Sequence, residues 1–502
     1  EYICLAHAAK ALKRPVKWTD ERSGSFLSDQ HGRDHEMTAA LALDRDGRFL
    51  ALRVTGYGNV GAYVGTVAPQ PPSMNVVRNV VSVYRTPLLE VSTKVCVTNT
   101  TPVSAYRGAG RPEANYYMER LIDEAAREMG IDRLELRRRN HVRPSEIPWK
   151  AASGMTFDSG DFPAVFEKAV RVIDGYEARK RASKARGRLR GLGIGSYLEV
   201  TAPPNKEMGG LRFDNAGGVT LVTGTLDYGQ GHASPFAQAL SSQLGIPFES
   251  VRLVQGDSDE IVFGAGTGGS RSMMMSGAAI AQVSRLVIDK GKELAAEALE
   301  AAAADIEFAH GKYTVIGTDR AIGIMDLAKR YTGKLDTTHV TEVIPSAFPN
   351  GCHVCEVEID PESGKVDVVR YHSVNDFGTV VNPLLVEGQV HGGVVQGIGQ
   401  CLMENARYDE EGQLLTGSFM DYALPRAEDI KTAIEWASHP VPAATNPLGV
   451  KGCGEAGCAG ALTSVMNAIV DALRPLGIHH FDMPASPQRV WDAIRNSGSG
   501  TE

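Results

Sequence analysis

Alternating apolar and polar residues predict short helices and strands in the first 150 residues. A helix is expected over 2–12 and a strand over 16–19. The alternation over 37–54 is interrupted by the turn sequence at 44–47, Asp-Arg-Asp-Gly, which predicts a β-hairpin. Apolar residues over 113–129 recur with the period of an α-helix. The pattern therefore indicates a region in which α and β elements are mixed.

From residue 191 onward, a β-rich segment, a glycine-rich turn and a long helix of small residues recur as a loose repeat. Glycine is concentrated where the strands meet the helices, which indicates an α+β, mixed α/β fold. The copies are 218–225, 227–232 and a helix to 244; 251–255, 264–271 and a helix to 304; and a loop at 449–460 before a helix to 473.

Composition changes abruptly near residue 150. Pro, Ser and Gly are frequent over 143–160, and a short helix and a basic run at 179–190 follow. The basic run contains no interleaved aromatic residues, so a solvated linker is favoured over a nucleic-acid patch. The expected domains are 1–150, a linker at 151–190, a second domain at 191–495 and a flexible tail at 496–502.

Charge and composition exclude several classes of protein. The chain has 52 Lys+Arg and 60 Asp+Glu, a net charge of −8, which disfavours binding to nucleic acid or to an anionic membrane by bulk attraction. No apolar run reaches the roughly 18 residues of a membrane span. Seven scattered cysteines suit the reducing cytoplasm. Glycine occupies 54 of 502 positions, about 11% against roughly 7% in ordinary proteins.

Two of the glycine-rich turns carry side chains suited to a large anionic ligand. A turn at a helix start leaves backbone N–H groups unpaired, and Arg, Thr and Ser can hold phosphate oxygens. Plain packing of the glycines and a hydrogen-bonded loop histidine remain the alternatives. No phosphate-binding loop of ATPases and no Rossmann fingerprint is found, so an NAD enzyme is a weaker reading. The candidate residues are Gln230, Gly231, His232, Thr267, Gly268, Gly269, Ser270 and Arg271.

Glu455 is the best catalytic candidate because it lies between glycines at the entry to a helix. Local N–H groups and the helix dipole favour an ionised carboxylate, which can act as a general base; a simple helix cap is the alternative. The segment 388–397 is predicted to be a buried helix in which glycines recur at a spacing of four. Close helix packing explains those glycines but leaves Gln396 unexplained.

The turn at 105–112 precedes a predicted helix and carries two arginines and a tyrosine. Such a turn suits a polar or planar substrate, and a purely structural turn is an equal alternative. In contrast, Cys352 and Cys355 lie in a predicted strand with no second pair or histidine set, so no metal site is expected there.

Taken together, the chain resembles the molybdopterin-binding large subunit of the molybdenum hydroxylases, the xanthine dehydrogenase and aldehyde oxidase family. The likeness is strongest to the large chains of aerobic carbon monoxide dehydrogenase, and it covers nearly the whole sequence. It depends on five motifs in the expected order, at 105–111, 229–232, 266–271, 396–397 and 452–457.

The resemblance implies a fold of two molybdopterin-binding domains and a molybdopterin cytosine dinucleotide cofactor. The glycine-rich turns, Gln396 and Gly454 would bind this cofactor, and Glu455 would be the catalytic residue. Molybdenum would be held by the pterin dithiolene, so no protein ligand is expected. The residues on the substrate side would be Tyr106, Arg107, Gly108 and Ala109.

The family's reaction places water-derived oxygen on an aldehyde, an N-heterocycle or a similar activated C–H group. Electrons would leave through a small subunit with 2Fe-2S clusters and a medium subunit with FAD, in a cytoplasmic dimer of heterotrimers. The large subunit of the family also has an N-terminal hammerhead domain and a glycine-rich loop before the point where this sequence begins. We therefore expect a truncated or split large subunit.

One further departure concerns the substrate. Copper-dependent carbon monoxide dehydrogenases have a cysteine in the loop where this chain has Gly108. Carbon monoxide oxidation by that route is therefore not expected, although this activity and a non-catalytic remnant of the family remain the alternatives.

Overall fold

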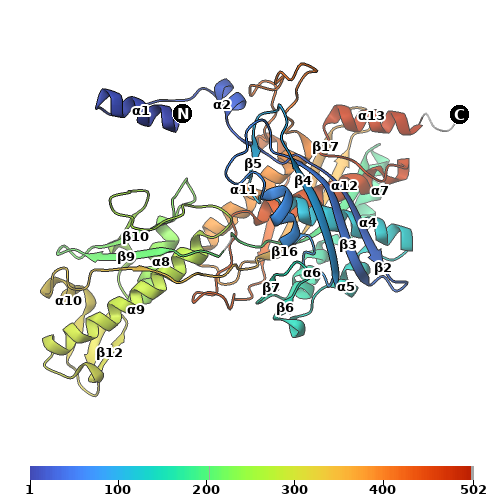
Figure 1. The fold of residues 1–502 in the computed structure, drawn as a ribbon. Coiled ribbons are helices and arrows are strands. Elements are labelled where there is room, and N and C mark those ends of the chain that lie inside the picture. Colours follow the sequence, from blue (N-terminus) through green and yellow to red (C-terminus); the bar gives the residue numbers. More distant parts are fainter. Residues whose placement is uncertain (203, 499–502) are drawn as a thin grey trace.

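The computed structural model of the chain describes residues 1–202 and 204–498 (Figure 1). The helices are α1 (Tyr2–Leu12), α2 (Arg22–Ser28), α3 (Val76–Asn79), α4 (Arg111–Met129), α5 (Arg133–Asn140), α6 (Phe162–Val170), α7 (Tyr176–Ala185), α8 (Ala233–Leu244), α9 (Ser272–Ala298), α10 (Ile324–Arg330), α11 (Pro383–Leu402), α12 (Ala456–Leu473) and α13 (Pro487–Gly498). Short 3₁₀ turns connect several of them. The predicted tail lies partly in α13, and residues 499–502 lie outside the described residues.

Within the described residues, the strands form six small sheets, four of them with three or more strands. The strands are β1 (His31–Gly32), β2 (His35–Leu43), β3 (Phe49–Asn59), β4 (Leu88–Cys96), β5 (Val103–Ser104), β6 (Trp149–Lys150), β7 (Thr156–Phe157), β8 (Leu189–Leu198), β9 (Met208–Phe213), β10 (Val219–Thr223), β11 (Val251–Val254), β12 (Ile306–Ala309), β13 (Lys312–Val315), β14 (Ala321–Gly323), β15 (Thr337–Val340), β16 (Asn350–Ile359), β17 (Val366–Asp376) and β18 (Ile434–Ser438).

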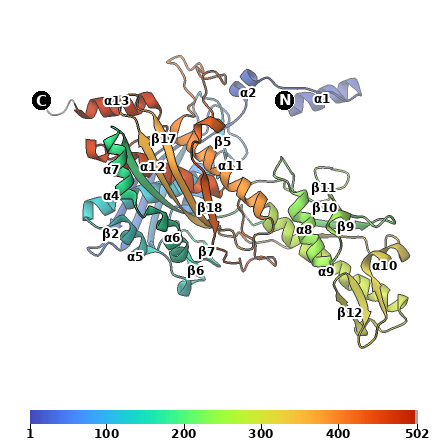
Figure 2. The ribbon, with the colours of Figure 1, turned by 180° about the vertical axis from the view of Figure 1, so that it is seen from behind.

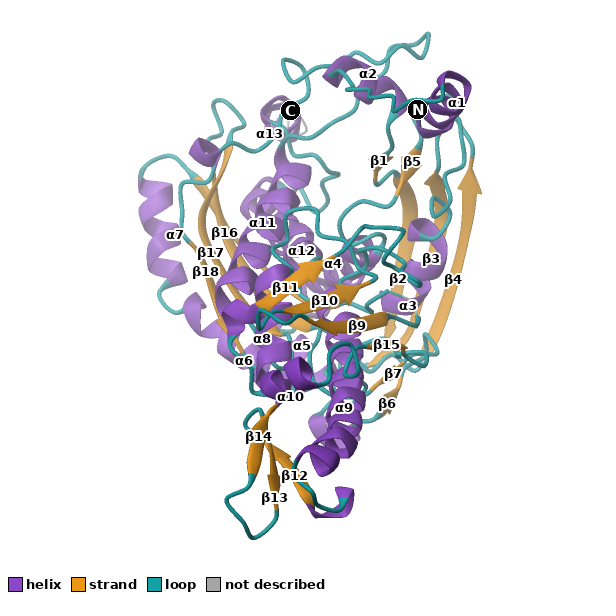
Figure 3. Ribbon diagram, turned by 90° about the vertical axis from the view of Figure 1, so that its left-hand side faces the viewer, coloured by secondary structure: helices purple, strands orange, loops and turns teal. Residues whose placement is uncertain are grey.

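The main body has a layer of helices between two sheets (Figure 3). One sheet has the order β18-β17-β16-β8, and the other contains β2, β3 and β4. β2 and β3 are the predicted antiparallel hairpin, and β4 adds in parallel to β3. Helices α4, α11 and α12 fill the space between the sheets, and α12 contacts β8, α11 and α4. The mixed α and β fold predicted from the sequence is confirmed.

Glycines on one face of β8 bring α12 unusually close to the sheet. Gly191, Gly193 and Gly195 alternate along this strand, so they point to the same side. A Cβ atom built on Gly191 would lie 1.9 Å from Ala468 O, and one on Gly193 would lie 1.9 Å from Ser464 O. Part of the glycine excess therefore serves packing and not a ligand.

A second lobe projects from the body (Figures 1 and 2). Its sheet has the order β11-β10-β9-β15 and packs against α9, while α8 lies against α9 and β11. The small sheet of β12, β13 and β14 lies at the far end of α9, beside α10. The predicted succession of strand, turn and helix is present in β10 with α8 and in β11 with α9. Helix α9 ends at Ala298, earlier than the predicted residue 304.

The N-terminal segment lies apart from the layered body (Figure 1). Helix α1 forms as predicted, but none of its residues is buried. Residues 16–19 form no strand, which corrects the expectation from the sequence. These residues are largely exposed and have no neighbouring strand with which to exchange backbone hydrogen bonds.

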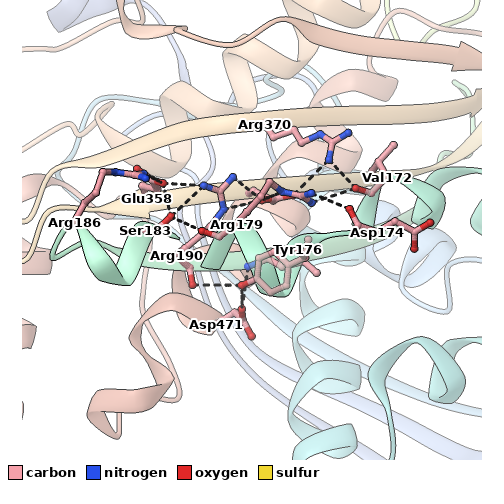
Figure 4. Close-up of polar contacts among 12 residues, drawn as sticks. Val172, Asp174, Tyr176, Arg179, Ser183, Arg186, Arg190, Glu358, Arg370 and Asp471 are labelled. Carbon is pink, nitrogen blue, oxygen red and sulfur yellow. Dashed lines mark hydrogen bonds and ion pairs between the residues drawn. The ribbon is translucent and has the colours of Figure 1, made fainter. Parts of the chain in front are cut away.

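Residues 151–190, predicted as a linker, fold onto the main sheet. Val165 and Phe166 of α6 are buried against residues of β8, β16 and β17. Arg179, Arg186 and Arg190 of the basic run pair with two glutamates of β16, as Figure 4 shows around Glu358. Arg190 lies 2.7 Å from Glu356 and 2.8 Å from Glu358. Part of the positive charge of this segment is thus neutralised within the fold.

Helix α12 is long and apolar enough to cross a membrane by length and composition. Almost all of it is nevertheless buried inside the protein, where it packs between the two sheets. We therefore interpret α12 as the core helix of the body. Its apolar surface is covered by protein, and it carries the candidate catalytic residue at its start.

Candidate functional site

A cavity of about 730 Å³ lies where the glycine-rich turns of the lobe meet the start of α12 and one face of α11. Most of the residues selected from the sequence line it. They are Arg107, Gln230, His232, Thr267, Gly268, Gly269, Ser270, Arg271, Gln396, Gly454 and Glu455. Tyr106, Gly108, Ala109 and Gly231 are not part of its lining.

Glu455 is held at the cavity wall by contacts from two other loops. Its Oε1 accepts a hydrogen bond from the backbone N–H of Gly108 at 2.9 Å, and its Oε2 accepts one from Ser270 Oγ at 3.1 Å. Arg111 Nη1 lies 3.8 Å from Oε2. The Glu455 side chain makes no capping hydrogen bond to α12, so the alternative of a simple helix cap is not supported.

These contacts control the ionisation of Glu455. Burial acts to raise its pKa, but Arg111, the neighbouring Glu199 carboxyl and the hydrogen bonds from Gly108 and Ser270 hold the pKa below its ordinary value. The carboxylate is therefore ionised at neutral pH. It faces the cavity as a proton acceptor.

Glu199 was not identified from the sequence, although it lies beside Glu455. It directly follows β8 and is fully buried. Burial, and then the negative charge of Glu455, raise the pKa of Glu199 well above its ordinary value. A glutamate after a strand of apolar and small residues carries no sequence signal of its own. Only the fold brings it to Glu455.

Arg107 connects the turn at 105–112 to α11 and to the Glu455 loop. Its Nη1 donates to Gln396 Oε1 at 2.9 Å, and its Nη2 donates to Gln389 Oε1 at 2.9 Å. Its Nε donates to the Gly454 carbonyl at 2.5 Å. Arg107 therefore does not point to solvent. Its hydrogen bond to Gln396 accounts for this side chain, which close helix packing alone leaves unexplained.

Gly108 allows the turn to approach Glu455. Its φ is +101°, a region that favours glycine. A Cβ atom at this position would lie 2.3 Å from Pro112 Cγ at the start of α4. The backbone N–H of Gly108 is consequently free to face the Glu455 carboxylate.

Tyr106 is held on the other side of this turn by Arg33. The guanidinium of Arg33 lies 4.7 Å from the centre of the Tyr106 ring, and Arg33 pairs with Glu113 at 2.9 Å. Arg33 also donates a hydrogen bond to the Arg107 carbonyl. Tyr106 and Ala109 are partly exposed, outside the cavity lining.

At the turn before α8, the Asp227 carboxylate already accepts hydrogen bonds from the backbone N–H groups. Asp227 accepts hydrogen bonds from the N–H groups of Gly229 at 2.8 Å, Gly231 at 3.2 Å and His232 at 2.8 Å. The expectation of unpaired N–H groups at this turn is therefore wrong. The side chains of Gln230 and His232 are what the turn offers to the cavity.

His232 is a neutral side chain in this environment. Its ring stacks on Phe236 at 4.9 Å, and Nδ1 lies 3.4 Å from Gln255 Oε1. Burial lowers the pKa of His232, although Asp227 and Gln255 act in the opposite direction. At neutral pH it can therefore offer a hydrogen bond but no positive charge.

The turn before α9 presents hydroxyls and a guanidinium to the cavity. Ser270 has a positive φ of +57°, which is rare for a residue other than glycine. Gly452 makes room for it, since a Cβ there would lie 1.8 Å from Ser270 O. Arg271 folds back so that Nη2 donates to Gly266 O at 3.1 Å, while its buried Nε has no partner among the described residues.

The glycines of α11 serve two different neighbours. Gly393 and Gly397 face α12, where a Cβ would lie 3.0 Å from Gly457 Cα and 2.5 Å from Ala461 Cβ respectively. Gly392 faces Arg107 Nη1 at 3.4 Å from the Cβ position. Close packing and space for the arginine network thus both explain this helix.

In residues 1–202 and 204–498, no group of three His, Cys, Asp or Glu side chains could hold a metal ion. Cys352 and Cys355 are buried in β16, and burial raises the pKa of Cys352 to about 12. The cavity instead offers an arginine with an unpartnered donor and open glycine backbone. A Cβ atom at Gly229 or Gly268 would meet nothing within 4 Å. Such a cavity fits a large polar ligand with anionic groups.

Two parts of the chain, residues 1–141 and 168–431, match the molybdopterin cofactor-binding domain. Nicotine 6-hydroxylase large subunit from Paenarthrobacter nicotinovorans is 33% identical, over 99% of this chain and 64% of the relative. The 6-hydroxypseudooxynicotine dehydrogenase complex subunit gamma from the same organism is 32% identical, over 98% of this chain and 64% of the relative.

Solved structures show the same architecture. Quinoline 2-oxidoreductase from Pseudomonas putida 86 matches with a TM-score of 0.92 and 30% identity, over 98% of this chain and 66% of that chain. The Cu,Mo-CO dehydrogenase matches with a TM-score of 0.92 and 29% identity, over 100% of this chain and 66% of that chain. This chain thus spans 64–66% of the length of these four proteins. It belongs to the molybdopterin-binding large subunits of the molybdenum hydroxylase family.

Proposed function

We propose that the chain is the catalytic part of a molybdenum-dependent hydroxylase, which places water-derived oxygen on an activated C–H group. The observation that carries this proposal is the ionised Glu455 carboxylate at the wall of a cavity suited to an anionic cofactor. A hydroxylation that uses water needs a base to take up a proton from the oxygen nucleophile. Glu455 is the carboxylate in the cavity lining, and it supplies that base.

The cofactor proposed for this cavity is molybdopterin cytosine dinucleotide. Arg271, the hydroxyls of Thr267 and Ser270, and the open backbone at Gly268 and Gly269 would hold its phosphates and polar edges. Gln230 and His232 at the turn before α8, and Gln396 and Gly454 beside Arg107, complete this binding surface, with Gly231 shaping the turn. When bound, the cofactor supplies a molybdenum centre that accepts two electrons from the substrate carbon.

The chain's own residues orient the base and control its charge. Gly108 N–H and Ser270 Oγ fix the two oxygens of Glu455, and Arg111 stabilises the anion. Arg107 joins α11 to the Gly454 carbonyl, which fixes the backbone of the loop that carries Glu455. The proton of the water-derived nucleophile is taken up at a carboxylate oxygen of Glu455.

An N-heterocycle is the substrate class that the relatives favour, with an aldehyde as the second candidate. Two of the relatives are named for nicotine 6-hydroxylation and for quinoline 2-oxidoreduction. Tyr106, Arg107, Gly108 and Ala109 would form the substrate side. Gly108 has no thiol to bind copper, its positive φ favours glycine, and a Cβ atom there would lie 2.3 Å from Pro112 Cγ. These features disfavour copper-dependent oxidation of carbon monoxide.

The proposed partners are a small subunit with 2Fe-2S clusters and a medium subunit with FAD, assembled as a dimer of heterotrimers in the cytoplasm. The name of one relative supports such an assembly, since it is subunit gamma of a dehydrogenase complex. Electrons from the substrate would leave the large subunit by this route.

Isotope-labelled water tests the proposed reaction. The native complex is purified with its neighbouring subunits, analysed for molybdenum and pterin, and incubated with quinoline or nicotine in ¹⁸O-labelled water with an electron-accepting dye. We expect a hydroxylated product that contains ¹⁸O. A complex without molybdenum, or a product with oxygen from O₂, would overturn the proposal.

A further inference from the structure

Glu199 reaches Glu455 from the strand layer, while Glu455 comes from the helix layer. The backbone N–H of Glu199 donates to Pro349 O at 2.8 Å, which fixes the residue at the end of β8. The next residue, Val200, accepts a hydrogen bond from Arg111 Nε at 2.6 Å. Arg111 is thereby held near both glutamates.

Neither carboxyl oxygen of Glu199 accepts a hydrogen bond in the part of the chain that the structure describes. The nearby Ser270 hydroxyl donates to Glu455 Oε2 instead, and Ser270 Oγ itself accepts from the Glu455 N–H at 3.1 Å. An ionised Glu199 would be a fully buried anion with no donor, beside a second anion. Such an arrangement is costly, and a shared proton removes the cost.

We propose that Glu199 is the protonated partner of Glu455, so that the two side chains form a carboxyl pair holding one proton. The Glu199 O–H donates to the Glu455 carboxylate. Arg111 is the one cation within ion-pair distance of Glu455 among the described residues, so a singly charged pair leaves the group neutral. Glu199 is a positioning residue that keeps Glu455 ionised and directed to the cavity.

The other titratable groups near Glu199 do not supply a competing charge. They are the Cys453 thiol and the Tyr197 hydroxyl, which donates to Asn375 Oδ1 at 2.8 Å. Burial raises the pKa of Cys453 to about 12, so this thiol stays neutral. Burial also keeps the pKa of Tyr197 well above its ordinary value. The charge of the pair is therefore set by Glu455, Glu199 and Arg111.

This inference deepens the proposed function and predicts a specific pattern in two variants. E199Q retains a neutral hydrogen-bond donor to Glu455. The apparent proton affinity given by the acid limb of the pH profile of kcat/KM should therefore change by less than twofold. E199L removes the donor, so the acid limb should move to higher pH because the ionised form of Glu455 loses a hydrogen bond. If Glu199 were an anion, E199Q would remove a repulsion and move the acid limb to lower pH, which would overturn the proposal.

Infrared difference spectra of the assembled complex provide a readout that needs no turnover. The wild-type complex should show the band of a buried protonated carboxylic acid, and E199Q should lack it. In the Glu455→Gln variant the band should remain but move to higher frequency, since the O–H no longer donates to an anion. A band unchanged in E199Q would overturn the proposal even if E199L fails to fold.

Glu207 provides a matched control. It is also a buried glutamate, but it accepts hydrogen bonds from the N–H groups of Met208 at 2.8 Å and Gly224 at 3.1 Å, away from Glu455. E207Q keeps an oxygen for both donors and should leave the acid limb unchanged. If Glu455→Gln retains activity while E199Q loses the infrared band, the proposed role of Glu455 fails and the carboxyl pair stands.

Discussion

The backbone N–H of Gly108 lies 2.9 Å from Oε1 of Glu455, although the two residues are 347 positions apart in sequence. One comes from the turn before α4, and the other comes from the loop that starts α12. The contact joins the first matched domain to α12, the core helix of the body. The donor that fixes the candidate base is a backbone N–H group, so it does not depend on the side chain at position 108.

Replacing Gly108 with alanine should disturb both stability and the base. The new Cβ would lie 2.3 Å from Pro112 Cγ at a φ of +101°, so we expect a loss of about 2–4 kcal/mol in the free energy of unfolding. Urea unfolding measures the loss. Gly154→Ala is the control, since Gly154 has a φ of +83° but open space around it, and it should cost about 1 kcal/mol. Equal losses in the two variants would contradict the close approach.

The contact of β8 with α12 predicts a second stability effect. In Gly193→Ala the Cβ would meet Ser464 O at 1.9 Å, so the helix must move away, at a cost of about 3 kcal/mol. Gly210→Ala in β9 is the matched control, because its nearest neighbours are side-chain atoms at 3.3 Å or more. It should cost less than about 1 kcal/mol. Equal decreases in the thermal unfolding midpoint of Gly193→Ala and Gly210→Ala would show that α12 tolerates a side chain on β8.

Much of this site was predictable because its residues lie in local patterns. Glycine-flanked Glu455 at a helix start, and the helix over 388–397 with Gln396, follow from short-range periodicity and turn chemistry. The role of Glu199 was not predictable, because only the packing of α12 across β8 brings this glutamate next to Glu455. Asp227 likewise fills the N–H groups of its own turn, and only the turn geometry reveals this.

The predicted linker illustrates the same limit for the fold. A basic run without apolar periodicity resembles a solvated segment. Three of its arginines nevertheless pair with Glu356 and Glu358 of β16, which lie more than 160 residues further along the chain. Such long-range charge pairing leaves no local signal. The strand expected at 16–19 does not form. A strand needs a partner strand, and none lies beside these residues in the described part of the chain.

Protonation of His141 should make the protein less stable in acid. Burial, with Arg137, Arg138 and Arg85 nearby, lowers the pKa of His141 to about 3. The unfolded chain has a histidine pKa of about 6.5, so it binds the proton first as the pH falls. This group should therefore cost about 2 kcal/mol of stability between about pH 7 and about pH 5.

H141F should remove this part of the pH dependence. Neither ring nitrogen of His141 has a partner among the described residues, and the ring stacks on Tyr84 at 5.1 Å, which a phenyl ring can also do. Urea unfolding at the two pH values gives the comparison. The exposed His480 serves as control, and H480N should keep the wild-type slope. A slope unchanged in H141F would show that another group is responsible.

Arg107 should be needed for retention of the cofactor. R107K keeps the charge but cannot reach Gln389, Gln396 and the Gly454 carbonyl together, because lysine lacks the planar donors of arginine. We expect molybdenum and pterin to be retained at least about tenfold less well after dialysis. R186K, at an exposed pair with Glu358, should retain both as the wild type does. Full occupancy in R107K would exclude a role of this network.

Substrate-dependent dye reduction by the Glu455→Gln complex is the most direct measure of whether Glu455 is the base of a molybdenum-dependent hydroxylation. Glutamine keeps one oxygen to accept the hydrogen bond from Gly108, and its NH₂ group can donate to Ser270 Oγ, but it cannot take up the proton. At equal molybdenum and pterin content, we expect kcat to fall by about 10²–10⁴-fold. A rate within about twofold of the wild type would contradict it.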